Sequence, residues 1–163
     1  MSLSLLVFCV VSFLAAMSGG IFRPGRWYWN LNKPSWQPPD WLFAPVWMVL
    51  YGMIAVAGWL VWEASNGSAV LAMALYGIQL VLNAGWSAIF FGMRRIDLAL
   101  VEVAFLWLSI AVTMIAFWPI SQTAALLLIP YLAWVSFAAF LNYTVLRLNP
   151  GIGPTPAAAD GTS

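Results

Sequence analysis

The residues of this chain best suited to binding a ligand are amides inside long apolar stretches. Gln79, Asn83 and Trp86 follow one another at steps of four and three residues, so on a helix they share one face. An amide in an apolar segment needs a hydrogen-bond partner, which a neighbouring helix or a bound ligand can supply. Both interpretations stay open: the amides hold helices together, or they line a binding site.

A second candidate face lies nearer the C-terminus. Tyr131, Trp134, Ala138 and Asn142 recur at steps of three and four residues. If this face meets Asn83, the two would frame a pocket with aromatic walls and a few amides. Such a lining suits a large, flat, mostly apolar ligand.

Several kinds of chemistry are excluded by residue types that the chain lacks. There is no histidine, which rules out a Ser-His-Asp triad, imidazole ligation of haem iron and a histidine-based metal site. Cys9 has no second cysteine to pair with, and no two carboxylates have a spacing typical of a general acid/base pair. We therefore expect no metal site, no obligatory cofactor and no conventional catalytic group.

The elements that position these residues follow from composition. Of 163 residues, 64% are hydrophobic and 7% are charged, against about 45–50% and about 25% in soluble domains. The sequence predicts an all-α integral membrane protein, a bundle of five transmembrane helices in one domain over residues 1–149. The predicted helices are 3–22, 45–62, 69–91, 98–117 and 123–146, with a bend at Pro130 and a disordered tail over 150–163.

The first loop, residues 23–43, is rich in aromatic residues and proline. Trp27, Tyr28, Trp29, Trp36 and Trp41 all lie in it. Prolines stiffen such a segment, so it is either a lid that holds aromatic rings over a cavity or a set of interfacial anchors.

The positions of the basic residues predict an orientation in the membrane. With five spans, the six lysines and arginines all fall on one side. The positive-inside rule places that side in the cytoplasm, with the N-terminus outside and the C-terminus inside. This pattern suits a bacterial inner membrane, with a mitochondrial outer membrane as the alternative. A net charge of +1 gives no basic surface for nucleic acid.

Two weaker patterns remain. Ala84, Ala88 and Gly92 form a small-residue stripe that permits close helix contact, within one chain or between two. The segment 141–147 carries Leu141, Tyr143 and Arg147, which match a proposed cholesterol-binding pattern.

Several blocks between residues 27 and 147 carry a family resemblance. They are Trp27-Tyr28, Leu31-Asn32-Lys33-Pro34-Ser35-Trp36-Gln37-Pro38-Pro39, Phe43-Ala44-Pro45-Val46-Trp47, Leu50-Tyr51, Gln79-Leu80, Leu82-Asn83, Phe90-Phe91-Gly92, Pro130-Tyr131-Leu132-Ala133-Trp134 and Leu141-Asn142-Tyr143. In order and spacing these blocks resemble the tryptophan-rich sensory protein and translocator protein family, also called TspO/MBR or peripheral benzodiazepine receptor family.

The resemblance implies a five-helix bundle that often forms homodimers in the lipid bilayer. It implies binding of porphyrins such as protoporphyrin IX, of cholesterol, and of isoquinoline-carboxamide or benzodiazepine-type ligands, in a pocket beneath the first loop. Carried over by motif, the ligand-binding residues are Trp36, Trp47, Tyr51, Asn83, Trp86, Trp134, Ala138 and Asn142. The chain departs from many members at Ala84 and Leu98, which bears on ligand preference.

The expected function is that of a membrane receptor or sensor that binds a metal-free porphyrin. One alternative is a transporter of porphyrin or lipid. Another is light-dependent breakdown of the porphyrin, with Trp36 or Trp134 as redox partners. A packing or assembly subunit would bind no ligand at all.

Overall fold

A computed structural model describes residues 2–151, and all the regular secondary structure in this part of the chain is helical. Its elements are α1 (Leu3–Ile21), α2 (Arg26–Trp29), α3 (Asp40–Ala64), α4 (Val70–Ser87), the π-helical turn η1 (Ala88–Gly92), α5 (Ile96–Phe117), α6 (Gln122–Leu127) and α7 (Ile129–Leu148). Within the described residues, five helical stretches are long and apolar enough to cross a membrane, with η1 extending α4 and with α6 and α7 forming one stretch. The predicted five-helix membrane bundle is confirmed.

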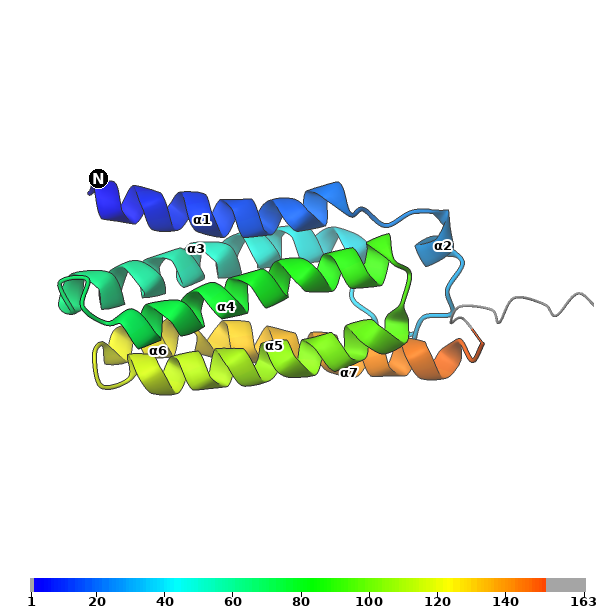
Figure 1. Ribbon diagram of the computed structural model, residues 1–163. Helices are drawn as coiled ribbons and strands as arrows, with labels where there is room; N and C mark the ends of the chain where they lie inside the picture. The colour runs from blue at the N-terminus through cyan, green and yellow to red at the C-terminus, as the bar shows by residue number, and fades with distance from the viewer. Residues whose placement is uncertain (1, 152–163) are drawn as a thin grey trace, which may run out of the picture.

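The helices run side by side along one axis (Figure 1). α1 packs on α3 and α4, α5 packs on α4 and α7, and α6 packs on α3. The loop between α1 and α3, which we call loop one, lies at the same end of the bundle as the C-terminal end of α7.

Close packing of α1, α3 and α4 depends on one glycine. A Cβ atom at Gly58 of α3 would lie 2.7 Å from Cζ of Tyr76 and 2.8 Å from Cδ1 of Phe8. The Tyr76 hydroxyl lies 3.2 Å from Ser12 Oγ and donates a hydrogen bond of 3.3 Å to the Ile54 carbonyl. A hydroxyl buried among three helices is thereby satisfied without water.

The second membrane helix begins at Asp40 rather than at Pro45 as predicted. Pro45 lies inside α3, which continues through it although its nitrogen has no hydrogen to give to the Trp41 carbonyl. Pro39 precedes the helix and the Asp40 carboxylate lies in its first turn, where it interacts favourably with the helix dipole. These features start the helix one turn earlier.

The fifth membrane stretch is interrupted close to Pro130, where the sequence predicted a bend. α6 ends at Leu127 and α7 begins at Ile129, with Leu128 at φ −86° and ψ −8° between them. Pro130 has no N–H to donate to the Leu126 carbonyl, and its ring clashes with a continuous helix. The Leu128 N–H instead donates to the Ala125 carbonyl at 3.1 Å, which tightens the last turn of α6.

Loop one contains the short helix α2, which the sequence did not predict. Loop one ends at Pro39 rather than at residue 43 as predicted, because α3 begins at Asp40. Of the predicted disordered tail, residues 152–163 lie outside the described part of the chain.

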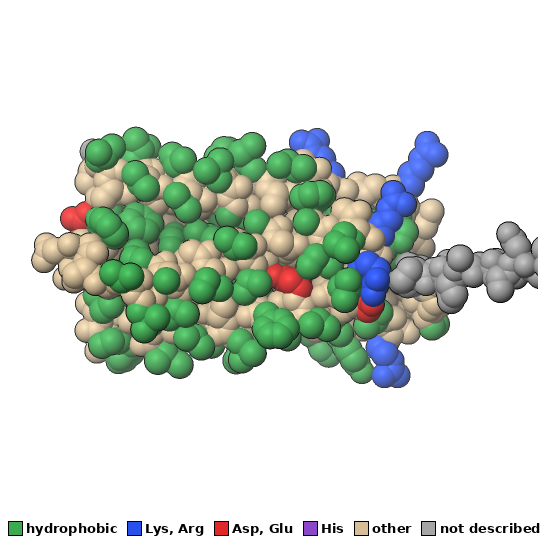
Figure 2. Space-filling view, viewed as in Figure 1, with side chains coloured by type: hydrophobic (Ala, Val, Ile, Leu, Met, Phe, Trp, Pro, Cys, Tyr) green, Lys and Arg blue, Asp and Glu red, His purple; other side chains and the backbone are tan. Residues whose placement is uncertain are grey.

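Charge is distributed unevenly over the surface (Figure 2). Hydrophobic side chains cover the long sides of the bundle, and lysine and arginine side chains gather at the loop-one end. These basic residues are Arg23, Arg26, Lys33, Arg94, Arg95 and Arg147. An apolar flank with charges at its end is what an integral membrane protein requires.

Candidate ligand-binding site

Asn83 joins three helices at the centre of the predicted site. Its side chain is only 5% exposed on α4. Nδ2 donates to the Tyr131 hydroxyl of α7 at 2.9 Å, and Oδ1 accepts a short hydrogen bond from the Tyr51 hydroxyl of α3. The structure therefore brings together the two polar faces that the sequence singled out. We call Tyr51, Asn83 and Tyr131 the Asn83 centre.

One predicted aromatic residue lies directly against the Asn83 centre. The ring of Trp47 lies 5.5 Å from that of Tyr51 and 6.2 Å from that of Tyr131, measured between ring centroids. Trp47 is half-buried, one turn before Tyr51 on α3. The centre thus has a polar middle and an aromatic side.

A row of aromatic rings extends along α7 to loop one. Phe43 packs edge-on against Trp134 at 5.6 Å, and Trp134 lies 5.3 Å from Phe137. Trp36 of loop one packs edge-on against Phe137 at 6.0 Å and stacks on Phe140 at 5.3 Å. We call these five residues the aromatic row. Trp36 remains 44% exposed, so loop one touches the bundle here without burying its tryptophan.

Two predicted residues contact a second group of buried residues, which includes Phe90 and Ile96. Trp86 stacks on Phe90 at 4.9 Å, and Phe90 in turn contacts Trp27 of α2 at 5.9 Å. The Asn142 side chain, 2% exposed, donates to the Ile96 carbonyl at the start of α5 at 3.0 Å. Asn142 thus holds the start of α5, whereas Trp86 packs both on this group and on the main core that contains Tyr131.

The remaining predicted residues have simpler surroundings. Ala138 is half-buried on α7, one turn after Trp134. Of the cholesterol-like pattern, Leu141 is half-buried against the cluster around Phe90, whereas Tyr143 and Arg147 are exposed. Arg147 Nη1 donates to the Tyr143 hydroxyl at 3.1 Å. The pattern is therefore divided between two faces of α7.

Loop one is held together by its own polar contacts. Lys33 Nζ lies 4.1 Å from the centre of the Tyr28 ring, within the range of a cation–π interaction. The Tyr28 hydroxyl donates to Asp40 at 3.1 Å, and Gln37 Nε2 donates to both groups. Burial and the nearby Asp40 carboxylate raise the pKa of Tyr28 to about 12, so its hydroxyl keeps its proton at neutral pH.

Several buried polar atoms have no hydrogen-bond partner among the described residues. Near the aromatic row and loop one they are the indole nitrogens of Trp134 and Trp86 and the side-chain oxygen of Asn142. Deeper in the bundle they include both amide atoms of Gln79 and both carboxylate oxygens of Glu102. Because buried polar groups are nearly always paired, these atoms are candidates for contact with a ligand or with water.

The small-residue stripe is used in part within the chain. A Cβ atom at Gly92 would lie 2.8 Å from Cδ1 of Phe22, so the end of α1 packs directly on this glycine. Ala84 and Ala88 are half-buried. Gly92 therefore serves a contact inside one chain.

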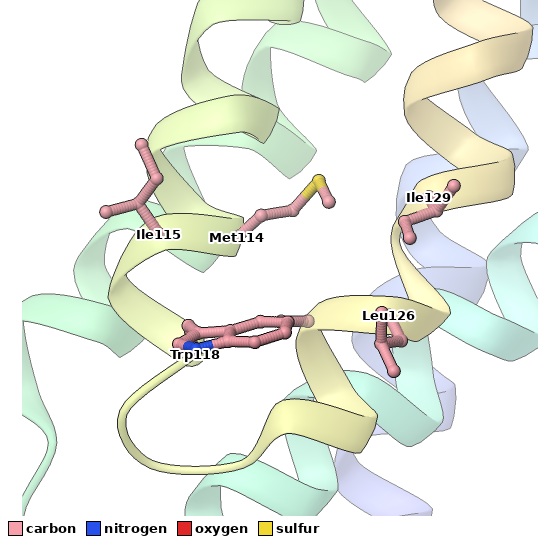
Figure 3. Close-up of a pocket in the computed structure, with 6 residues that line it drawn as sticks. Met114, Ile115, Trp118, Leu126 and Ile129 are labelled. Carbon is pink, nitrogen blue, oxygen red and sulfur yellow. The ribbon is translucent and has the colours of Figure 1, made fainter.

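A surface hollow lies at the end of the bundle opposite loop one. It has a volume of about 360 Å³ and is lined by Met114, Ile115, Trp118, Ala125, Leu126 and Ile129. Figure 3 shows these side chains around the break between α6 and α7, with the Trp118 ring lying across the hollow. Its lining is apolar, so it offers no polar group to select a ligand.

Comparison with known proteins decides the family. Residues 5–148 match the TspO/MBR family. The chain belongs to the TspO/MBR family. The predicted family is thereby confirmed, and so is the five-helix membrane fold that the resemblance implied.

Curated relatives of this TspO/MBR family member come from bacteria and mammals. The chain is 47% identical to the tryptophan-rich protein TspO of Chlorobaculum tepidum, covering 89% of this chain and 96% of that protein. It is 45% identical to the human translocator protein, covering 77% and 76%. It is 40% identical to the tryptophan-rich sensory protein of Cereibacter sphaeroides, covering 82% and 84%.

Sequence reasoning missed three aromatic residues of the site in this family member. Phe43, Phe137 and Phe140 contribute rings to the aromatic row but were not singled out. A signal was present, because Trp134, Phe137 and Phe140 follow at three-residue steps on one helix. Phenylalanine in an apolar helix is so common that the spacing alone does not separate a site from a lipid-facing surface.

Proposed function

We propose that this TspO/MBR family member is a membrane receptor or sensor that binds a metal-free porphyrin between α3, α4 and α7, beneath loop one. Family membership supports the broader class of membrane sensor or transporter. Relatives named tryptophan-rich sensory protein and translocator protein are of that class. The observation that carries the proposal is the Asn83 centre beside the aromatic row.

The lining of this region matches the chemistry of a tetrapyrrole. A porphyrin has a large, flat apolar face, which tryptophan and phenylalanine rings contact well, and a polar middle, which amide or hydroxyl groups can bond. The Trp134 indole N–H has no partner among the described residues and stands within the aromatic row. Because the chain has no histidine to bind iron, the metal-free ring is the better ligand.

Charge supports an orientation for the ligand. Protoporphyrin carries carboxylates at one edge of its ring, and the basic side chains gather at the loop-one end of the bundle (Figure 2). Lys33, for example, lies close before Trp36 in the same loop. We infer that the carboxylate edge lies beneath loop one, and that this end faces the cytoplasm of a bacterial host.

A homodimer in the bilayer is part of this proposal. Exposed apolar side chains continue along α1, including Leu6, Val10 and Phe13. A second copy or lipid can cover such a face. Light scattering of the detergent-solubilised protein would give twice the chain mass for a dimer and the single mass for a monomer.

Transport of the porphyrin or of a lipid is the second candidate, favoured by the human relative's name, translocator protein. Binding measurements do not separate a receptor from a transporter. Directional flux of protoporphyrin into vesicles that contain the protein would favour transport. Tight binding without flux would favour a receptor.

The experiment that tests the proposal is a tryptophan-fluorescence titration of purified protein with protoporphyrin IX. Saturable quenching is expected for the wild type, with affinity reduced roughly tenfold in Trp134→Ala and Asn83→Ala. Trp118→Ala is the matched control, because it also removes one tryptophan but lies at the turn between α5 and α6, at the end opposite loop one. Unsaturable quenching that is equal in all four proteins would mean partitioning into detergent and would overturn the proposal.

A further inference from the structure

Asn149, the residue that follows α7, is bonded to loop one through its side chain. It is 5% exposed. Its Oδ1 accepts a hydrogen bond of 2.9 Å from the Asn32 N–H, and its Nδ2 donates one of 2.9 Å to the Asn32 carbonyl. Nδ2 also donates to the Val145 carbonyl at 2.7 Å. Residues far apart in the sequence are thus joined at two points.

This side chain acts as an extra peptide group. Its carbonyl and N–H pair with the N–H and carbonyl of one residue, as a neighbouring strand would. The bond to Val145 supplies a donor for the Val145 carbonyl, which lies in the last turn of α7 and lacks a normal helical partner. Both Nδ2 hydrogens and Oδ1 are therefore used, in contrast to Gln79, whose amide has no partner among the described residues.

The point of attachment lies close to the tryptophan that contacts α7. Asn32 itself is exposed and precedes Trp36 by four residues, which span at most about 14 Å when extended. Next to it, Leu31 is buried in the cluster around Phe90 and Ile96. One buried leucine and one asparagine thus fix the chain just before Trp36 meets Phe140.

We propose that Asn149 is a positioning residue, a latch that holds loop one against the end of α7 and so keeps Trp36 over the aromatic row. The latch itself requires no ligand. Its consequence for a ligand rests on the proposed function: if a porphyrin binds beneath loop one, opening the latch speeds its escape.

The chain offers a matched control. Asn149 bonds only the backbone of Asn32, which any residue provides. Asn32→Ala therefore keeps the latch and loses only a hydrogen bond of 3.4 Å from its own side chain to the Leu148 carbonyl. Asn149→Ala removes all three bonds of the latch. The two substitutions are chemically identical and affect neighbouring atoms.

The test is hydrogen exchange of the full-length protein in lipid nanodiscs, followed by mass spectrometry. In Asn149→Ala, amides 30–36 should exchange roughly tenfold faster than in the wild type, since two hydrogen bonds that hold this segment are lost. In Asn32→Ala they should stay within about twofold. Amides 76–83 of α4 report in the same sample that the bundle is folded. If Asn149→Ala does not fold, Asn149→Asp keeps the side-chain size, loses both donors and should likewise speed exchange.

If amides 30–36 of the folded Asn149 variant exchange at the same rate as in the wild type, the latch is overturned. This outcome does not depend on porphyrin binding. Dissociation of bound protoporphyrin IX, measured by stopped flow, should be roughly tenfold faster in Asn149→Ala and unchanged in Asn32→Ala. Faster loop exchange without faster dissociation would overturn the positioning role. If the wild type binds no porphyrin saturably, the proposed function fails, and the exchange measurement alone still decides the latch.

Discussion

Two buried polar regions lie on neighbouring turns of α4, and they differ in how their hydrogen bonds are satisfied. At Asn83, tyrosine hydroxyls from α3 and α7 engage both atoms of the amide. One turn earlier, Gln79 is 1% exposed and its amide has no partner among the described residues. On the facing helix, Glu102 is 9% exposed and its carboxylate is likewise unpaired.

The difference separates an amide whose bonds hold the helices around the proposed site from polar groups that have no partner among the described residues. An amide whose oxygen and nitrogen are each bonded to a tyrosine hydroxyl of another helix fixes three helices relative to one another. An unpaired amide or carboxylate in an apolar interior costs free energy, and proteins keep such groups mainly where they function. Substitutions at the two regions should therefore have opposite effects on stability.

The largest effect is expected for Asn83→Ala. The substitution leaves the hydroxyls of Tyr51 and Tyr131 buried without their partner, so the free energy of unfolding should fall by roughly 1–3 kcal/mol. Denaturant unfolding in detergent micelles measures it. Asn30→Ala, at an exposed position in loop one, is the control. A loss no greater than that of the control would mean that the Asn83 centre does not hold the helices.

Tyr131→Phe should have a smaller effect of the same sign. It removes the hydroxyl that accepts the hydrogen bond from Asn83 Nδ2 while keeping the ring, so a loss of about 1 kcal/mol is expected. Thermal unfolding compares it with Tyr143→Phe, whose hydroxyl is exposed and bonded only to Arg147. Equal melting temperatures for the two variants would contradict the importance of the Asn83–Tyr131 bond.

Gln79→Leu should change stability in the opposite direction. Replacing a buried, unpaired amide with an apolar side chain of similar size is expected to raise the free energy of unfolding by about 1 kcal/mol. Unfolding in the same detergent measures this change. A loss of stability would show that Gln79 has a partner, such as bound water, and would remove the contrast with Asn83.

Gly85→Ala should have the smallest effect. A Cβ at this position lies 3.8 Å from Oε1 of Glu102, which is ordinary contact, and alanine favours helix over glycine. We expect a gain within about 0.5 kcal/mol. Gly58→Ala is the informative comparison, because its Cβ would lie 2.7 Å from Tyr76. If both variants unfold alike, the space beside Glu102 is tighter than the structure indicates.

Much of the fold was predictable because it depends on local properties of the chain. The lengths of the apolar stretches predicted five membrane-spanning helices. The helical spacing of Gln79, Asn83 and Trp86 identified a polar face. Of these three residues, only Asn83 meets the tyrosines. A helical face is broad, and the Trp86 ring, three residues after Asn83, stacks on Phe90.

The parts that sequence did not predict depend on long-range contacts. Nothing local to Asn149 indicates that its side chain bonds Asn32, since asparagine before proline usually reads as a simple turn. Similarly, the sequence predicted a bend near Pro130 but not the interruption of the helix at Leu128, because the exact geometry at a proline depends on the neighbouring helices.

The central claim is that a porphyrin binds beneath loop one, between α3, α4 and α7. The most direct measurement is hydrogen exchange of the nanodisc-embedded protein with and without saturating protoporphyrin IX. The account predicts slower exchange in residues 30–41 and 131–142, with no change in residues 114–129 around the hollow at the opposite end of the bundle. Protection confined to residues 114–129, or absent from the whole chain, would contradict it.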